Sequence, residues 1–427
     1  MSDLPPEEFR RHAHEVVDWI ADYLQSVGDY PVLAQMEPGE LEAQLPASAP
    51  EKGEPMESIL ADFRTQILPA VTHWNHPRFH AYFSVSASGP GILGEMLASA
   101  LNVNGMVWKS SPAATELEIV TLRWLREWIG LPQSFFGVIF DTASISTMHA
   151  IAAAREFTDP ESRLRGGRQD LIVYTSEQAH SSVEKGAIAL GFGRDNVRKI
   201  AVDSSFRMRP DRLAAAMEED RRAGKRPCCV VPTVGTTSTT SIDPVDKIAV
   251  VAESHGAWMH VDAAYGGAAA ILPELRHILA GSSRAHSLVV NPHKWLFTPV
   301  DLSVLYTSRP DVLKRAFSLV PDYLQTPESG RAIDYMDYGV PLGRRFRSLK
   351  LWFVMRYFGR ERVIEILRSH IAWASEFADV VRQDPHFELA APVPLSLVCF
   401  RYRGSDEANR QLLERINASG TTFLSHT

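Results

Sequence analysis

The chain has 427 residues, with 44 basic and 51 acidic side chains and a formal net charge of −7. Its hydrophobic fraction of 45% and charged fraction of 22% are typical of a globular protein and exclude a chain that is disordered throughout. The acidic balance argues against a nucleic-acid binder that works through bulk positive charge. No apolar run is long enough to predict a membrane span, and the N-terminus lacks the features of a signal peptide. We therefore expect a cytoplasmic protein without nucleic-acid or membrane partners.

The cysteines are consistent with a reducing compartment. Cys228 and Cys229 are neighbours on a predicted strand and would point to opposite faces, so we expect no bond between them. Together with Cys399 they offer no CxxC or Cys/His spacing for zinc. We expect buried free thiols and no metal site.

The first predicted elements are helical. Apolar residues from Phe9 to Leu24 recur at helical spacing, and Gly28 ends the pattern. A proline-rich connection runs from Pro31 to Pro55, and a second amphipathic helix spans Ile59 to Leu68. We assign residues 1–85 to a helical arm and dimerisation segment that needs another surface to cover its apolar stripe.

From about residue 113 to 310, short apolar strands alternate with helices. Strands are predicted at Leu171–Tyr174, Cys228–Val231, Trp258–Val261, Leu288–Val290 and Ser303–Tyr306. One helix is marked by Asp243 as N-cap, Pro244 at its first helical position and Gly256 after its end. The alternation predicts an α/β fold with a mostly parallel sheet, in which ligands bind at the carboxyl ends of the strands. We assign residues 86–358 to this large domain.

The last part of the chain has a different pattern. It predicts a helix through Val363–Phe377, a strand at Leu395–Tyr402 and a helix at Ala408–Asn417. We expect residues 359–427 to form a small α+β domain at the C-terminus.

Two of these strands are followed by residues that can carry chemistry. Lys294 lies just after a strand, between His293 and Trp295. A desolvated lysine there is nucleophilic and can form a Schiff base, and the alternative is a lysine that only extends to solvent. Asp262 closes another strand, where it can pair with a pyridinium nitrogen or simply cap a turn.

Two further segments complete a possible site. Thr142, Ala143 and Ser144 open a helix, whose free N–H groups can bind an anion, although Ser and Thr are also ordinary N-caps. His180 lies just past a strand, where a purely structural histidine is the alternative. Together, a phosphate cradle, an imidazole, a carboxylate and a lysine are what a pyridoxal phosphate enzyme requires.

In combination, five segments resemble the pyridoxal-phosphate-dependent group II decarboxylases, in particular the aromatic-L-amino-acid decarboxylase branch. The segments are Thr72–Trp74, Gln178–Glu184, His260–Tyr265, Asn291–Trp295 and Pro341–Lys350. The resemblance covers essentially the whole chain. It implies the fold type I of pyridoxal phosphate enzymes and an obligate homodimer with a shared active site. It also implies decarboxylation of an aromatic L-amino acid, such as tryptophan, phenylalanine, tyrosine or a dopa-like acid, to the aryl amine and CO2.

The resemblance also implies residue roles. Lys294 corresponds to the lysine that binds the cofactor aldehyde, Asp262 to the partner of the pyridine nitrogen, and His180 to the residue stacked on the ring. Tyr323 resembles the loop tyrosine that returns a proton to the substrate Cα. Cofactor contacts are implied for Thr142, Ala143, Ser144, His180, Thr237, Asp262, Asn291, His293 and Lys294. Substrate contacts are implied for Trp74, Tyr82, Phe83, Val85, Asn104, Met106, His180 and Gly343.

The chain departs from the family at several positions. Val85 stands where the family has a substrate-contacting threonine, and Asn104 and Met106 replace residues that are more apolar or aromatic in animal enzymes. The family also continues beyond Thr427 with a further strand and helix, so we expect a shortened small domain. The alternatives are an aldehyde synthase or a transaminase with the same cofactor, and a non-catalytic homologue. Retained Tyr323 and His180 favour decarboxylation.

Overall fold

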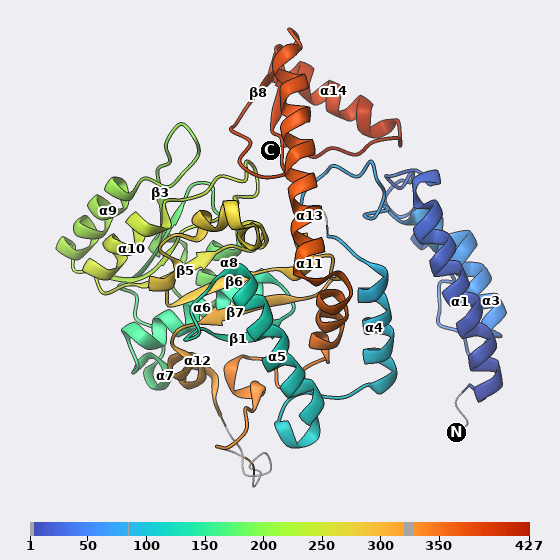
Figure 1. Cartoon of the computed structure of the whole chain (residues 1–427), viewed down its shortest axis with the longest axis horizontal. Helices are drawn as coiled ribbons and strands as arrows, with labels where there is room; N and C mark the ends of the chain where they lie inside the picture. Colours follow the sequence, from blue (N-terminus) through green and yellow to red (C-terminus); the bar gives the residue numbers. More distant parts are fainter. Residues whose placement is uncertain (1–3, 84, 320–327, 329) are drawn as a thin grey trace. The chain divides into compact units, whose positions relative to one another are not determined.

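The computed structural model describes residues 4–83, 85–319, 328 and 330–427 (Figure 1). The chain divides into two compact units, one of residues 1–84 and 404–427 and one of residues 85–403. In this division residues 359–403 belong to the larger unit, and the last residues belong with the N-terminal arm. The three-domain division, with ends at residues 85 and 358, stays a prediction.

The smaller unit is mainly helical. Its helices are α1 (Pro6–Ser26), α2 (Glu40–Gln44), α3 (Met56–Asp62) and α14 (Asp406–Ala418). Both predicted N-terminal helices are confirmed, and α3 continues into a π-turn over Phe63–Ile67. The apolar stripe of α1 is partly covered because Trp19 stacks on Tyr23, with ring centroids 5.2 Å apart, and meets Phe63 edge-on at 5.0 Å.

The larger unit contains a sheet and the helices that cover it. The strands of the sheet are β1 (Phe136–Phe140), β2 (Leu171–Ser176), β3 (Val197–Ile200), β4 (Arg226–Val231), β5 (Trp258–Asp262), β6 (Ser287–Val290) and β7 (Ser303–Thr307). The helices are α4 (Gly89–Leu101), α5 (Pro112–Ile129), α6 (Ala143–Thr158), α7 (Ser162–Arg165), α8 (Ser182–Ala189), α9 (Pro210–Arg222), α10 (Val245–Ser254), α11 (Pro292–Trp295), α12 (Pro310–Phe317) and α13 (Arg347–Gln383). A break at Gly359 interrupts α13. A two-stranded sheet of β8 (Phe387–Leu389) and β9 (Phe400–Tyr402) follows it.

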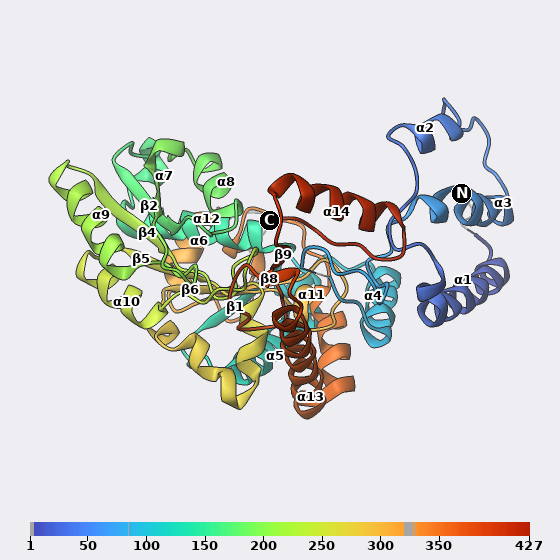
Figure 2. The ribbon, with the colours of Figure 1, turned by 90° about the horizontal axis from the view of Figure 1, so that it is seen from above.

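The order of strands in the main sheet is β1-β7-β6-β5-β4-β2-β3. Pairing is parallel from β6 through β5, β4 and β2 to β3, while β7 is antiparallel to both of its neighbours. Figure 2 shows α6, α8 and α12 on one side of this sheet and α10 on the other. The predicted mostly parallel α/β fold is confirmed, and the carboxyl ends of β4, β5 and β6 meet at one edge.

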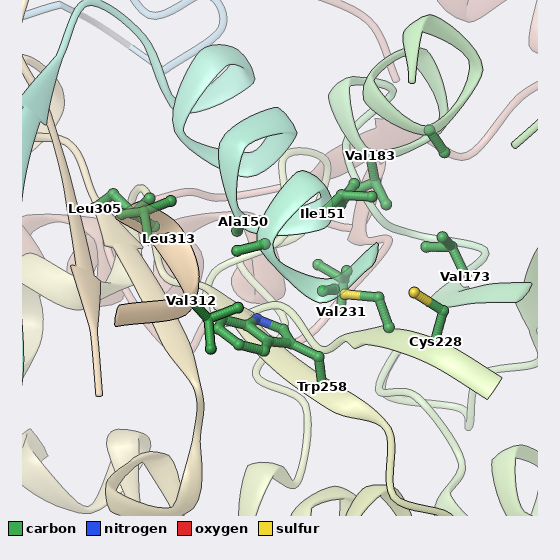
Figure 3. Close-up of a cluster of buried hydrophobic side chains, with 14 of the residues drawn as sticks. Ala150, Ile151, Val173, Val183, Cys228, Val231, Trp258, Leu305, Val312 and Leu313 are labelled. Atoms are coloured by element: carbon green, nitrogen blue, oxygen red, sulfur yellow. The ribbon is translucent and has the colours of Figure 1, made fainter. Parts of the chain in front are cut away.

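The core of this unit lies between α6 and the sheet (Figure 3). Ala150 and Ile151 of α6 face apolar side chains of the strands, including Cys228 of β4 and Trp258 of β5, and all four are buried. The Trp258 indole N–H donates to Ser287 Oγ at 2.9 Å, so its polar atom is satisfied inside the core. Cys228 and Cys229 are buried free thiols, as predicted, whereas Cys399 is only partly buried.

The predicted N-cap role of Asp243 is wrong. Helix α10 begins at Val245, and Pro244 precedes it without a side-chain cap. The Asp243 carboxylate instead accepts the backbone N–H groups of Met208, at 2.6 Å, and Thr233, at 2.8 Å. Burial raises the pKa of Asp243 to about 6, against the effect of these two donors. The Asp243 carboxylate therefore binds N–H groups from other segments of the chain and does not cap α10.

The predicted strand at Leu395–Tyr402 is wrong in extent. Only Phe400–Tyr402 forms strand β9, because its partner β8 offers just the three residues Phe387–Leu389 for pairing. Leu395 is buried without belonging to a strand. The sequence pattern also missed β3, which pairs with β2 along the edge of the main sheet. Among the described residues, no helix is long and apolar enough to cross a membrane.

The packing of α4 against α13 yields a stability prediction. A Cβ atom at Gly94 would lie 2.7 Å from the Cα atom of Lys350, so Gly94→Ala must push the two helices apart. We expect it to lower the free energy of unfolding by about 1–3 kcal/mol, the usual cost of overpacking. Gly89→Ala on the same helix is the control, since a Cβ there meets no atom within 4 Å. Equal urea midpoints for the two variants would contradict this packing argument.

Candidate active site

Three neighbouring strands deliver the predicted site residues to one edge of the sheet. Beyond the end of β4, the N–H of Val234 donates to the carbonyl of Asp262 at 2.8 Å. Beyond β6, the N–H of Asn291 donates to the carbonyl of Ala264 at 3.0 Å. These backbone bonds hold the three strand ends side by side, so the relative positions of Asp262 and the segment Asn291–Lys294 are set by the sheet itself.

Lys294 lies on the short helix α11, directly after β6. Burial lowers the pKa of its ammonium group, and the Asp262 carboxylate acts in the opposite direction. The backbone around it is fixed by Ser86, whose hydroxyl donates to the Lys294 carbonyl at 2.8 Å and accepts the N–H of Phe297 at 3.1 Å. The amine is therefore held in place and is easier to deprotonate than a lysine in water, as a nucleophile requires.

Asp262 is the last residue of β5 and is buried. One of its carboxylate oxygens, Oδ1, accepts the N–H of Ala264 at 3.1 Å. Its charge opposes the effect of desolvation on the pKa of Lys294 and of His180, because a nearby carboxylate favours the protonated form of each. A buried carboxylate beside a cation is suited to hold a protonated ring nitrogen.

His180 precedes helix α8, and the residue as a whole is exposed in this structure. Its Nδ1 accepts the backbone N–H of Ser182 at 3.2 Å and lies 2.9 Å from the Ser182 hydroxyl. Because Nδ1 is an acceptor, we assign the ring proton to Nε2. Removal from water lowers the pKa of His180, and the charge of Lys294 adds to this effect. The ring is thus a neutral, flat surface with an N–H donor at its far side.

His293 and Asn291 form a second polar pair beside Lys294. The N–H of Leu302 donates to His293 Nδ1 at 2.9 Å, and burial lowers the pKa of this histidine to about 4. Its proton therefore lies on Nε2, 3.3 Å from the atom placed as Asn291 Nδ2; because two donors cannot bond to each other, we assign the amide oxygen to that position. The other end of this buried amide has no hydrogen-bond partner among the described residues. That end is then an NH2 donor, which suits an anionic group such as a phosphate.

Helix α6 supplies further anion-binding groups. It begins at Ala143, after Thr142, with no side-chain cap, so the first N–H groups of the helix, including that of Ser144, lack partners within the helix. One turn further on, Thr147 Oγ1 lies 3.3 Å from Nε2 of His260, two residues before Asp262 on β5. The helix therefore packs on the sheet face beside the lysine and carboxylate. A phosphate cradle, a lysine and a carboxylate fit a phosphorylated pyridine aldehyde.

Three of the predicted substrate residues form a separate group in the same unit. The side-chain oxygen of Asn104 accepts the N–H of Arg344 at 2.9 Å, and its nitrogen lies 3.7 Å from Met106 Sδ. A Cβ atom on Gly343 would lie 3.7 Å from that same nitrogen. Asn104, Met106 and Gly343 thus lie together, and their role as substrate contacts stays a prediction.

Arg344 connects this group to the main sheet. Its guanidinium donates to Glu118 Oε1 at 2.7 Å and to the Ile139 carbonyl at 2.9 Å. Both partners in the ion pair are buried, and the cation also lies 4.5 Å from the ring centroid of Tyr335. Since Ile139 belongs to β1, the strand that leads into Thr142 and Ala143, Arg344 ties Asn104 to the strand before the anion-binding helix.

The remaining predicted residues lie elsewhere. Trp74 and Tyr82 belong to the smaller unit, where their rings stack with centroids 5.9 Å apart, and Phe83 follows them. Val85 begins the larger unit and is partly buried. Thr237 is exposed in the loop after β4. Tyr323 lies outside the described residues.

Sequence reasoning missed several residues that support the site. Ser86 and Ser182 hold Lys294 and His180 through the bonds described above, but serine is too common for its presence to signal such a role. Tyr265 and Trp295 stack almost in parallel, with centroids 4.7 Å apart and 2° between the planes. Their aromatic character next to Asp262 and Lys294 was a usable signal. No group of His, Cys, Asp and Glu within the described ranges could hold a metal ion.

The charge of Asp262 predicts the titration of His180. Because the carboxylate stabilises the imidazolium, Asp262→Asn should lower the pKa of His180 further in cofactor-free protein. Histidine ring resonances followed by NMR against pH measure this shift. Glu177→Gln, an exposed carboxylate three residues before His180, is the control and should have a smaller effect. An unchanged or higher pKa in Asp262→Asn would show that the two groups do not interact.

Comparison with known proteins identifies the family. The chain matches the pyridoxal-dependent decarboxylase conserved domain over residues 38–403. It is 43% identical over 442 residues to tryptophan decarboxylase TDC2 of Camptotheca acuminata, covering 99% of this chain and 89% of that protein. Phenylacetaldehyde synthase of Arabidopsis thaliana is 41% identical over 444 residues, covering 100% of this chain and 90% of that protein. The crystal structure of Oryza sativa TDC with PLP and tryptamine superposes with a TM-score of 0.96 at 39% identity, covering 100% of this chain and 92% of that one. The chain therefore belongs to the pyridoxal-dependent decarboxylase family, and pyridoxal phosphate is its cofactor.

Proposed function

We propose that this protein decarboxylates an aromatic L-amino acid to the aryl amine and CO2. The observation that carries the proposal is the convergence of Asp262 and the half-buried Lys294 at the carboxyl ends of the parallel strands β5 and β6, which backbone hydrogen bonds hold side by side. The aromatic class is supported by the relatives, one named a tryptophan decarboxylase and another a phenylacetaldehyde synthase. The aromatic residues Trp74, Tyr82 and Phe83 are the proposed substrate contacts of the smaller unit, and Val85, Asn104, Met106 and Gly343 those of the larger one.

Each proposed catalytic group has a distinct task. When bound, pyridoxal phosphate supplies an aldehyde that reacts with amines and a ring that accepts electrons. The low pKa of Lys294 favours the neutral amine needed for attachment, and the Asp262 carboxylate holds a proton at the ring nitrogen. His180 offers a flat neutral ring for stacking. Tyr323 is proposed to donate the proton that replaces the carboxylate at the substrate Cα.

The groups that would hold the phosphate lie around these residues. The N–H groups at the start of α6, with Thr142, Ala143 and Ser144, provide partial positive charge. Asn291 adds a side-chain donor whose orientation is set by the Nε2–H of His293, and His293 and Thr237 are proposed as further contacts. Because the donors come from β1, β4 and β6, the sheet orients the cofactor before substrate arrives.

We also propose a homodimer in the cytoplasm. Helix α4 exposes Leu93, Met96, Leu97 and Leu101, an apolar surface that a second copy would cover. The resemblance further implies that the active site is shared between the two copies. The free cysteines are in keeping with a reducing compartment.

The assignment of Lys294 can be tested directly. Lys294→Ala should abolish decarboxylation and the covalent attachment of cofactor, while the protein stays folded. Borohydride reduction followed by mass spectrometry measures attachment, and circular dichroism checks the fold. Lys185→Ala on α8 is the control and should attach cofactor like the unmodified protein. A borohydride-stable adduct in Lys294→Ala would mean that another lysine has this role.

A second candidate function is aldehyde synthesis, because a phenylacetaldehyde synthase is among the relatives. Retained Tyr323 favours the decarboxylase. Tyr323→Phe should therefore reduce amine formation and increase aldehyde, ammonia and peroxide, since the proton donor for Cα is lost and dioxygen can react instead. Product analysis in air for both enzymes measures the change. Amine formation at the unmodified rate without extra peroxide would remove Tyr323 from this role.

A further inference from the structure

Thr233 has a buried hydroxyl with no hydrogen-bond partner among the described residues. The residue is 4% exposed and lies two positions after the end of β4. Leaving a buried hydroxyl unpaired has a cost in free energy, so native proteins seldom keep one without a reason. The missing partner can be a bound cofactor, or a side chain of this protein that moves when the cofactor binds.

The backbone places this hydroxyl beside Asp262. Thr233 and Asp262 are partners in a parallel bridge, which is flanked by the N–H of Asp262 donating to Pro232 at 2.9 Å and the N–H of Val234 donating to Asp262 at 2.8 Å. Bridge partners present their side chains on the same face of a sheet. The N–H of Thr233 points the other way, to Asp243, as this register requires.

We propose that Thr233 is a positioning residue for the cofactor, whose hydroxyl donates to the Asp262 carboxylate when pyridoxal phosphate is bound. The inference rests on the proposed role of Asp262 as partner of the ring nitrogen. The Ala264 N–H already occupies Oδ1 of this carboxylate. A second donor on the same carboxylate fixes its rotamer, so that an oxygen faces the ring nitrogen.

The Thr233 hydroxyl would also stabilise the negative charge of the Asp262 carboxylate. A hydrogen bond to the ionised form of a carboxylate favours that form. Hydrogen bonds donated by Thr233 and Ala264 would stabilise the negative charge that pairs with the ring nitrogen. Thr233 thereby helps to keep the cofactor ring protonated, which is the state that accepts electrons.

The competing assignment is a purely structural hydroxyl that serves Asp243. The two assignments predict different stabilities for the cofactor-free variant. If the hydroxyl has no partner there, replacing it by an isosteric methyl group removes an unpaired polar atom and does not lower stability. If it supports Asp243, the same replacement destabilises the protein with or without cofactor.

The experiment compares Thr233→Val, Thr233→Ser and the unmodified protein. We expect Thr233→Val to weaken cofactor binding by about tenfold, the lower range for a hydrogen bond to a charged group. Equilibrium dialysis of pyridoxal phosphate measures this affinity. In Thr233→Val, the visible absorption of the bound cofactor should change at a lower pH than in the unmodified protein, because the ring nitrogen loses its proton more easily. Thr233→Ser should restore both properties, and the melting temperature of cofactor-free Thr233→Val should equal or exceed that of the unmodified protein.

Thr175→Val is the matched control. Thr175 is also a buried threonine near the end of a strand, but its hydroxyl donates to the Val231 carbonyl at 3.1 Å. Its loss should lower stability without changing the absorption or affinity of the cofactor. Unchanged cofactor affinity in Thr233→Val, or a lower melting temperature of its cofactor-free form, would overturn the proposal.

Asp262→Asn separates this inference from the proposed role of Asp262. If Asp262→Asn alters the cofactor absorption and Thr233→Val does not, only the inference about Thr233 fails. If Asp262→Asn leaves the absorption unchanged, the role of Asp262 itself is wrong. In that case the inference falls with it.

Discussion

The active site depends on the parallel pairing of β4, β5 and β6. Three consecutive strands in space end at one edge, and backbone hydrogen bonds continue past their ends to fix Asp262 between Thr233 and the Asn291 segment. The backbone hydrogen bonds between the strands hold this arrangement of the strand ends. The same register sets which residues share a face, so a slip of one residue in β5 would turn Asp262 away from the site.

Around these strand ends, backbone N–H donors determine which ring nitrogen of two histidines carries the proton. Both histidines next to Lys294 accept a main-chain N–H at Nδ1, from Ser182 in His180 and from Leu302 in His293. The acceptor role keeps each ring neutral with its proton on Nε2, and burial reinforces the effect by lowering the pKa of each. Neutral rings can lie next to a lysine without repelling its cationic form. The partial positive charge that would meet the phosphate is thus left to the N–H donors at the start of α6.

Much of this site could be predicted because its residues follow strands that are visible as apolar runs. Asp262 ends one such run and Lys294 follows shortly after another, so their positions at the sheet edge follow from the strand pattern. The error at Asp243 has the opposite origin. Its sequence neighbours suggest a helix cap, but its oxygens are taken by Met208 and Thr233, which no local pattern connects to it. The short pairing at β9 was hidden for the same reason, since strand length depends on a partner elsewhere in the chain.

The link made by Arg344 has a consequence for how this enzyme can change over evolution. One guanidinium spans Glu118 and the β1 carbonyl of Ile139, while the backbone of the same residue holds Asn104 next to Gly343. A substitution at position 104 or 343 therefore disturbs the residue that braces the strand leading to the anion-binding helix. Given the proposed substrate role of Asn104 and Gly343, adaptation to a new aromatic side chain and retention of the cofactor become coupled traits. New ring specificities should arise most readily at the positions that Arg344 does not touch.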